Sequence, residues 1–278
     1  MKRHARGRAA LLAAAVIPWL LLGCTLTRFP GGVAPTPTPT LAPVIEASPE
    51  PESGWQIIAP GVERRAALIT PEGGGRFRAV MVRLQPALVS FRVHYTAGEG
   101  RSIEAWQDRL PGALAVFNAG FFDESRHALG LLVSDGQVYG QSFWGFGGMF
   151  QVSTGQVRVR SLVSEPYQGE WLDQAAQAFP MLIEGGQLAP QGEGFDRRSR
   201  RTVIGQDGSG RVIVIAVPNS TASFAEIQDW LYHSDLNLST AFALDGGRST
   251  GLSLRTPAGD EAYSALDQLP SVIAVYPR

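Results

Sequence analysis

One stretch near the carboxyl end joins an apolar strand to a cluster of groups that could bind or transform a ligand. Residues 240–244 are apolar or β-favouring, and a carboxylate, two glycines, a guanidinium and two hydroxyls follow directly. Glycines allow backbone N–H groups to approach a ligand closely, and arginine can offer a bidentate fork to a phosphate. The pattern predicts that the carboxylate of Asp245 lies at a strand end, beside groups that bind phosphate. The predicted phosphate-binding residues are Gly246, Gly247, Arg248, Ser249 and Thr250. The alternative is an ordinary tight turn, because Asp-Gly is also a hairpin signal.

The same stretch contains a second chemical pattern, G-x-S-x-G, at residues 247–251. In α/β-hydrolases this pattern places a nucleophilic serine between a strand and a helix, with a histidine later in the chain. Here residues 252–254 alternate like a strand, and all four histidines precede Ser249. A serine esterase that uses Ser249 is therefore the least favoured functional hypothesis.

Two further predicted strands end in polar groups and glycine. Residues 113–117 lead into Asn118 and Asp123, and residues 181–183 lead into Glu184 and two glycines. Strand ends that are distant in sequence can meet at one rim of a sheet-based fold. Carboxylates gathered in this way could also hold a hard divalent cation, which prefers oxygen ligands, although no dedicated calcium loop is present. A metal requirement stays open.

Residues 1–53 indicate the localisation of the protein and not its fold. Four basic residues and a short apolar run make residues 1–23 a signal peptide, and the run ends in Leu-Leu-Gly before Cys24. This ending resembles the bacterial lipobox, so we expect Cys24, the only cysteine, to be lipidated and to anchor an extracytoplasmic protein to the membrane. Residues 24–53 are rich in Pro and Thr and predict an extended, disordered stalk.

Residues 54–278 predict a single globular domain with an α+β fold, made of largely antiparallel or mixed β-sheet with a few flanking helices. Strands over 66–70, 77–84 and 88–95 predict an antiparallel meander. Ser102 is a predicted helix N-cap, Ser223 and Glu226 form a predicted capping box, and a short helix is expected around residues 171–179. The net charge of −1 and the absence of a basic aromatic cluster argue against nucleic acid as a partner.

Five motifs, in this order along the chain, resemble the phosphodiester glycosidase family, bacterial relatives of the N-acetylglucosamine-1-phosphodiester α-N-acetylglucosaminidase called the uncovering enzyme. They lie at residues 118–123, 130–136, 179–185, 200–205 and 243–250. The resemblance implies a mixed α/β fold and hydrolysis of the bond between a sugar C1 and a phosphate, in a glycan or an envelope polymer. A non-catalytic module that binds the same glycan is the competing hypothesis.

The resemblance and the chemistry of the reaction together suggest roles for residues of this chain. Asp245 matches a family position and is expected to act as nucleophile or base, with Asp123 or Glu184 as the second carboxylate. Arg201 and Arg248 would contact phosphate, and Asn118 would orient a sugar hydroxyl. The chain departs from the family pattern at Ala119 and Arg248, where glycines are expected, and at Glu184, where no fixed acid is expected.

Overall fold

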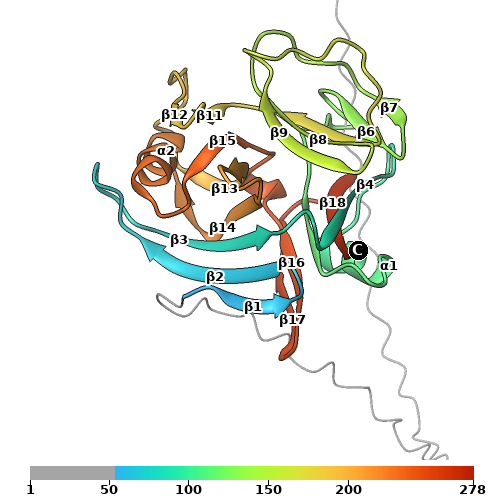
Figure 1. Cartoon of the computed structure of the whole chain (residues 1–278), viewed down its shortest axis with the longest axis horizontal. Coiled ribbons are helices and arrows are strands. Elements are labelled where there is room, and N and C mark those ends of the chain that lie inside the picture. The colour runs from blue at the N-terminus through green and yellow to red at the C-terminus, as the bar shows by residue number, and fades with distance from the viewer. Residues whose placement is uncertain (1–53) are drawn as a thin grey trace, which may run out of the picture. The chain divides into compact units, whose positions relative to one another are not determined.

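The computed structural model describes residues 54–278, which fold around three antiparallel sheets and two α-helices (Figure 1). They belong to one compact unit, as the sequence predicts for a single α+β domain. Neither α-helix in this part of the chain is long and apolar enough to cross a membrane. The predicted signal peptide, Cys24 and the stalk lie outside the described residues.

The largest sheet has eight strands and carries the Asp245 stretch at the end of one of its inner strands. In spatial order the strands are β1 (Gln56–Ala59), β2 (Val62–Ile69), β3 (Phe77–Leu84), β14 (Val212–Ala222), β13 (Ser199–Asp207), β15 (Leu238–Ala243), β11 (Met181–Glu184) and β12 (Gln187–Leu188). The apolar run 212–217 in β14 is buried throughout, which is the pattern of a strand covered on both faces.

Helix α2 (Phe224–His233) covers one face of this sheet (Figure 1). The predicted capping box begins it: the Ser223 hydroxyl accepts from the Glu226 N–H, and the Glu226 carboxylate accepts from the Ser223 N–H. Its Ile227 and Leu231 are buried against the apolar side chains of β3, β11, β13 and β14. The capping box is therefore confirmed, and it fixes where α2 begins.

A five-stranded sheet carries the Asn118 stretch. Its strands, in spatial order, are β17 (Gly259–Tyr263), β16 (Leu252–Thr256), β5 (Ala115–Asn118), β18 (Ser271–Pro277) and β4 (Val89–Tyr95). Helix α1 (Ile103–Arg109) starts at Ser102, whose side chain accepts from the Ala105 N–H, and it packs Ile103 and Trp106 on this sheet. The predicted N-cap at Ser102 is confirmed. The predicted meander is only half right, since β4 pairs with β18 and not with β3.

The third sheet corrects a helix prediction. Its strands, in spatial order, are β7 (Gln137–Tyr139), β6 (Leu132–Ser134), β10 (Gln174–Ala178), β8 (Gly148–Ser153) and β9 (Gln156–Ser161). The helix expected around residues 171–179 is wrong, because residues 174–178 form β10, which is buried along its whole length between β6 and β8. Burial between two strands outweighs the helix propensity of its three alanines.

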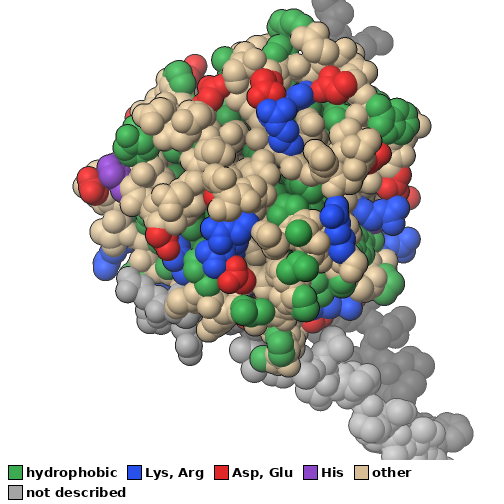
Figure 2. Space-filling model, viewed as in Figure 1, with side chains coloured by type: hydrophobic (Ala, Val, Ile, Leu, Met, Phe, Trp, Pro, Cys, Tyr) green, Lys and Arg blue, Asp and Glu red, His purple; other side chains and the backbone are tan. Residues whose placement is uncertain are grey.

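The three sheets share one core, formed by apolar residues from all of them, among them Phe91, Phe117, Phe150 and Phe242. The remaining core clusters lie beneath α1, beneath α2 and on the outer face of the third sheet. On the face drawn in Figure 2, acidic and basic side chains are interspersed among hydrophobic and neutral ones. The shared core brings the ends of β5, β10 and β15 toward one another, and the candidate site lies there.

Candidate functional site

Asp245 lies where the eight-stranded sheet meets the sheet that contains β5. It follows β15 by two residues, and its backbone N–H donates to the carbonyl of Ala119, just beyond β5 (3.2 Å). The short 3₁₀ turn η1 (Gly247–Ser249) follows. Gly247 has a φ of +59°, and a Cβ on Gly246 would lie 3.0 Å from the Arg200 carbonyl oxygen. These two glycines therefore allow the turn and its close approach to β13.

Asn118 holds this turn in place. Its side-chain N–H donates to the Asp245 carbonyl (2.7 Å), while its Oδ1 accepts from the Thr202 hydroxyl (2.8 Å) and from the Gly251 N–H (3.2 Å). The side chain is 1 % exposed, so these partners and not a ligand satisfy it. Asn118 therefore lies at the site, but beneath it: the side chain holds the Asp245 turn in place and is not open to a ligand.

The Asp245 carboxyl has a perturbed acidity. Burial raises its pKa to about 6, although hydrogen bonds from the Ser249 hydroxyl and the Gly246 N–H favour the charged form. A carboxylic acid with such a pKa is about ten-to-one ionised at pH 7, and it can accept a proton near neutrality. Strong perturbation by desolvation inside a pocket is typical of functional carboxylates.

A cavity of about 440 Å³ opens over Asp245, in the size range of small-molecule sites. Its wall combines three charged side chains with an apolar majority. The lining residues are Phe121, Phe179, Pro180, Gly192, Glu193, Phe195, Arg201, Phe224, Leu244, Asp245 and Gly246. The aromatic residues come from the segments after β5, β10 and β12 and from α2, so the cavity depends on all three sheets.

Arg201, on β13, supplies the positive charge of this cavity. Its guanidinium carbon lies 3.7 Å from the centre of the Phe224 ring, and its Nε donates to the Ala222 carbonyl (3.1 Å). One terminal nitrogen donates to the Arg197 carbonyl, which leaves the other without a partner among residues 54–278. Burial lowers the pKa of Arg201 to about 10, so it stays cationic at neutral pH and can meet a phosphate oxygen.

Three side chains that were predicted to contact phosphate do not line the cavity. The Arg248 side chain is two-thirds exposed and pairs with Asp267 (2.8 Å), pointing along the surface beside Leu266. Thr250 is completely buried beneath the turn. Ser249 is also buried and bonds to the Asp245 carboxylate. Of the predicted phosphate-binding side chains, only Arg201 lines the cavity.

The two predicted partner carboxylates are not beside Asp245. The Asp123 side chain is 43 % exposed and closes its own turn, accepting from the His127 N–H (2.8 Å). Glu184 pairs with Thr240 at the start of β15, whereas Asp245 follows the end of that strand, roughly 16 Å of extended chain away. Its carboxylate accepts from the Ser164 hydroxyl (2.8 Å). Of the three predicted strand ends, those at Asn118 and Asp245 therefore meet, and the one at Glu184 lies apart.

The structure instead places Glu193 on the cavity wall, an acid that the sequence reasoning missed. It lies in an exposed loop between β12 and β13, flanked by Gly192 and Gly194. The glycine-flanked glutamate is a visible signal, but it follows no predicted strand end, and only the fold shows that this loop reaches Asp245.

Neither a metal cluster nor a serine triad is formed by the described residues. No group of three or more His, Cys, Asp or Glu side chains among residues 54–278 could hold a metal ion, so Asp123, Glu184 and Asp245 do not form the cation site considered above. The histidines of this part of the chain bond away from Ser249: His94 to Tyr276, His127 to Asp123, and His233 to Asp229.

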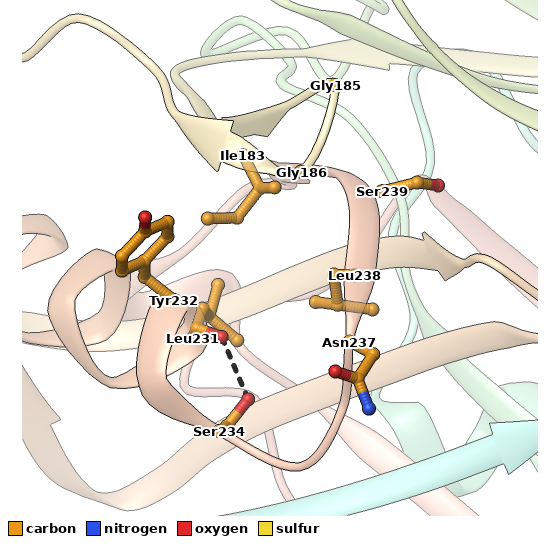
Figure 3. Close-up of a pocket in the computed structure, with 9 residues that line it drawn as sticks. All are labelled: Ile183, Gly185, Gly186, Leu231, Tyr232, Ser234, Asn237, Leu238 and Ser239. Carbon is orange, nitrogen blue, oxygen red and sulfur yellow. Dashed lines mark hydrogen bonds between the residues drawn. The ribbon is translucent and has the colours of Figure 1, made fainter.

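A second cavity, of about 320 Å³, lies at the opposite end of β15 (Figure 3). Two of its hydroxyls have partners within the protein: the Ser234 hydroxyl donates to the Leu231 carbonyl (2.9 Å; Figure 3), and the Ser239 hydroxyl donates to the Gln206 carbonyl (2.8 Å). No charged side chain lines it. The cavity over Asp245 is therefore the better candidate for chemistry.

Comparison with known proteins shows which family the chain belongs to. The family model for phosphodiester glycosidases matches residues 111–276, which include Asn118, Arg201 and Asp245. A comparison with curated proteins found no matching sequence.

Two solved structures share the fold. The catalytic domain of zebrafish N-acetylglucosamine-1-phosphodiester α-N-acetylglucosaminidase, auto-inhibited by its pro-peptide, is 19% identical, with a TM-score of 0.62 over 79% of this chain and 85% of that one. A hypothetical protein from Synechocystis is 17% identical, with a TM-score of 0.54 over 78% of this chain and 62% of that one. The chain belongs to the phosphodiester glycosidase family and is a hydrolase of that kind.

Proposed function

We propose that this protein hydrolyses sugar-1-phosphodiesters of the cell envelope at the bond between the sugar C1 and the phosphate oxygen, in the cavity over Asp245. The observation that carries the proposal is the pairing, in one cavity, of a partly buried carboxylate, whose pKa desolvation raises to about 6, with a partly buried guanidinium. Such a pair suits a reaction that builds positive charge on a sugar and negative charge on a phosphate.

In the proposed reaction the C1–O bond breaks and its electron pair stays on the phosphate oxygen. Water supplies the hydroxyl that forms on C1, so the products are the free sugar, the phosphate monoester of the alcohol and one proton. Asp245 lies against C1 and stabilises the oxocarbenium-like transition state, either by its charge or by bonding to C1. The phosphate leaves without full protonation, which reduces the need for a strong acid catalyst.

The other charged residues of the cavity take the remaining roles. Arg201 binds the phosphate through its available terminal nitrogen and offsets the charge that develops there. Glu193 is the second carboxylate at hand, and it receives the proton that water releases. Asn118 acts indirectly, by fixing the Asp245 turn.

Turnover, not affinity, tests this proposal. The full-length protein is incubated with a panel of sugar-1-phosphodiesters, beginning with N-acetylglucosamine-1-phosphodiesters because the zebrafish protein is named for them, with and without divalent cations. We expect release of the free sugar and of a phosphate monoester in equal amounts. Binding to these compounds without release of sugar would favour the non-catalytic glycan-binding module instead.

We also propose that Cys24 is lipidated and that residues 24–53 hold the hydrolase outside the membrane that anchors it. The support is the sequence alone: a basic start, a short apolar run, Leu-Leu-Gly-Cys, and a Pro-Thr-rich segment. Replacing Cys24 with Ala should abolish processing that is sensitive to globomycin and move the protein from the membrane fraction. Unchanged processing and membrane retention would contradict the lipoprotein assignment.

A further inference from the structure

The cavity over Asp245 continues into an apolar groove. A neighbouring hollow of about 270 Å³ shares four wall residues with it: Phe179, Pro180, Gly192 and Phe195. Its other wall residues are Phe146, Gly147, Val163, Met181, Glu184 and Pro190. A ligand bound at Asp245 can therefore extend along this wall without leaving the protein surface.

The groove offers little to a polar ligand. Glu184 is the only charged or hydrogen-bonding side chain on its wall, and the Ser164 hydroxyl already donates to that carboxylate (2.8 Å). A sugar or a peptide placed here would exchange bonds to water for contacts with Phe, Val, Met and Pro, which is unfavourable. An aliphatic chain has no hydroxyl or amide to leave unsatisfied, so the composition of the wall favours it.

Aromatic side chains line the route from the catalytic cavity into the groove. Phe121 contacts Phe179 (centroids 4.7 Å apart), and Phe179 contacts Phe146 (5.4 Å), with Phe143 packed against both Phe146 and Phe179. Phe146 is 46 % exposed, Phe179 41 % and Val163 54 %. A contiguous apolar surface of this kind, open to solvent and joined to a catalytic cavity, is typical of a ligand-binding surface.

The chemistry of a phosphodiester decides which part of the substrate enters the groove. C1 of the sugar must lie at Asp245 and the phosphate at Arg201, and the sugar hydroxyls need polar partners. The group that remains is the alcohol esterified on the other side of the phosphate. Resting on the function proposed above, we propose that this alcohol is aliphatic, so that the substrates are sugar-1-phosphate diesters of lipid-like alcohols whose chain lies in the groove formed by Phe146, Val163 and Phe179.

A homologous series of substrates tests this inference. The full-length protein is assayed with methyl, n-butyl and n-octyl diesters of α-N-acetylglucosamine 1-phosphate, below their micellar concentrations, and with a diester whose alcohol is O6 of methyl glucoside. We expect kcat/KM to rise about two- to threefold per methylene in contact with the groove, and at least tenfold from methyl to octyl. The glucoside diester should be no better than the methyl diester.

A matched pair of variants shows whether the groove causes this preference. Val163→Ser removes an apolar side chain from the groove, whereas Val138→Ser removes one of similar exposure, 48 %, from β7. The ratio of octyl to methyl kcat/KM should fall at least threefold in Val163→Ser and further in Phe146→Ser, and it should keep its wild-type value in Val138→Ser. All variants are assayed with the same substrates in the same buffer, so a change confined to the groove variants reports the groove.

The outcomes separate this inference from the function on which it rests. Turnover that is independent of chain length, or faster with the glucoside alcohol, would overturn the aliphatic assignment and leave the hydrolase intact. Calorimetry with methyl phosphate and n-octyl phosphate needs no turnover. Tighter binding of octyl phosphate that depends on Val163 would support the groove even if no diester were cleaved, and equal binding of the two phosphates would overturn it.

Discussion

Asp245 and Asp123 follow strands of similar character, yet the fold gives their carboxylates different surroundings. Asp245 is partly buried at a junction of two sheets, and desolvation raises its pKa to about 6. The Asp123 side chain is 43 % exposed, in a turn of five residues that it closes itself through the His127 N–H. An aspartate beside glycine or aromatic residues at a strand end is therefore not enough to predict chemistry, because what packs over the carboxylate decides its properties.

Neutralising the two aspartates one at a time should give the largest difference in activity. Asp245→Asn keeps the size of the side chain but removes its charge, so we expect kcat on a sugar-1-phosphodiester to fall at least about a thousandfold. Asp123→Asn should stay within about threefold of wild type, because asparagine can accept the same bond from the His127 N–H. Steady-state kinetics with thermal melts as a folding control will separate the two. Equal losses in both variants would remove the contrast.

The two turns should also differ in how much their side chains stabilise the fold, and Asn118 tests this for the Asp245 turn. Asn118→Ala leaves the Thr202 hydroxyl and the Gly251 N–H without their buried partner, and it frees the Asp245 carbonyl. We expect the free energy of unfolding to fall by about 3 kcal/mol, since buried polar groups that lose their partners are expensive. Denaturant titration measures this. Asp123→Ala, which opens only a surface turn, should lower stability by less than about 1 kcal/mol.

The burial of Asp245 should also cost the protein stability near neutral pH. The folded-state pKa of about 6 lies above 3.8, the ordinary pKa of an aspartate. Between these two pH values the folded state therefore holds a proton that the unfolded state has lost. Stability from this group is full below about pH 3.8 and declines as pH rises toward 6. Asp245→Asn should therefore raise the unfolding free energy by about 1–3 kcal/mol at pH 7. The gain should vanish below pH 4, and a destabilised variant at pH 7 would contradict the assignment.

Substitutions at the other side chains of the Asp245 turn should change kcat/KM by smaller amounts. Ser249→Ala removes a hydrogen bond that favours the Asp245 carboxylate, so we expect kcat/KM at pH 6 to fall by up to about tenfold. Arg248→Gly should change it by less than about twofold, because Arg248 pairs with Asp267 outside the cavity. A serine esterase would instead lose all turnover in Ser249→Ala. A large loss in Arg248→Gly would show that the side chain turns into the site.

Local features of the fold could be predicted because they depend on neighbouring residues. The N-cap at Ser102 and the Ser223–Glu226 capping box are short-range hydrogen bonds that the sequence displays directly. The error at residues 174–178 has the opposite origin, because their strand exists only through pairing with β6 and β8. The same limit explains why β4 was placed beside β3 rather than β18.

The site shows the same division. Asp245 and Arg201 were found from motifs, and the structure brings both to one cavity, while their catalytic roles stay predictions. Glu184 was misplaced because antiparallel pairing with β15 sends it to the far end of the strand, a fact of register that sequence alone does not contain. Glu193 and the contact between Phe121 and Phe179 were missed because loops from three sheets form the wall of the cavity.

The pH dependence of kcat/KM tests the central claim, that a partly buried and ionised Asp245 carries the reaction. If the carboxylate is the active form, kcat/KM should rise as pH increases, with a midpoint of about 6, and level off above about pH 7. Ser249→Ala should move this midpoint upward, because its hydrogen bond lowers the pKa of Asp245. A midpoint near or below pH 4, the ordinary range of a solvated aspartate, with no shift in Ser249→Ala, would contradict the account.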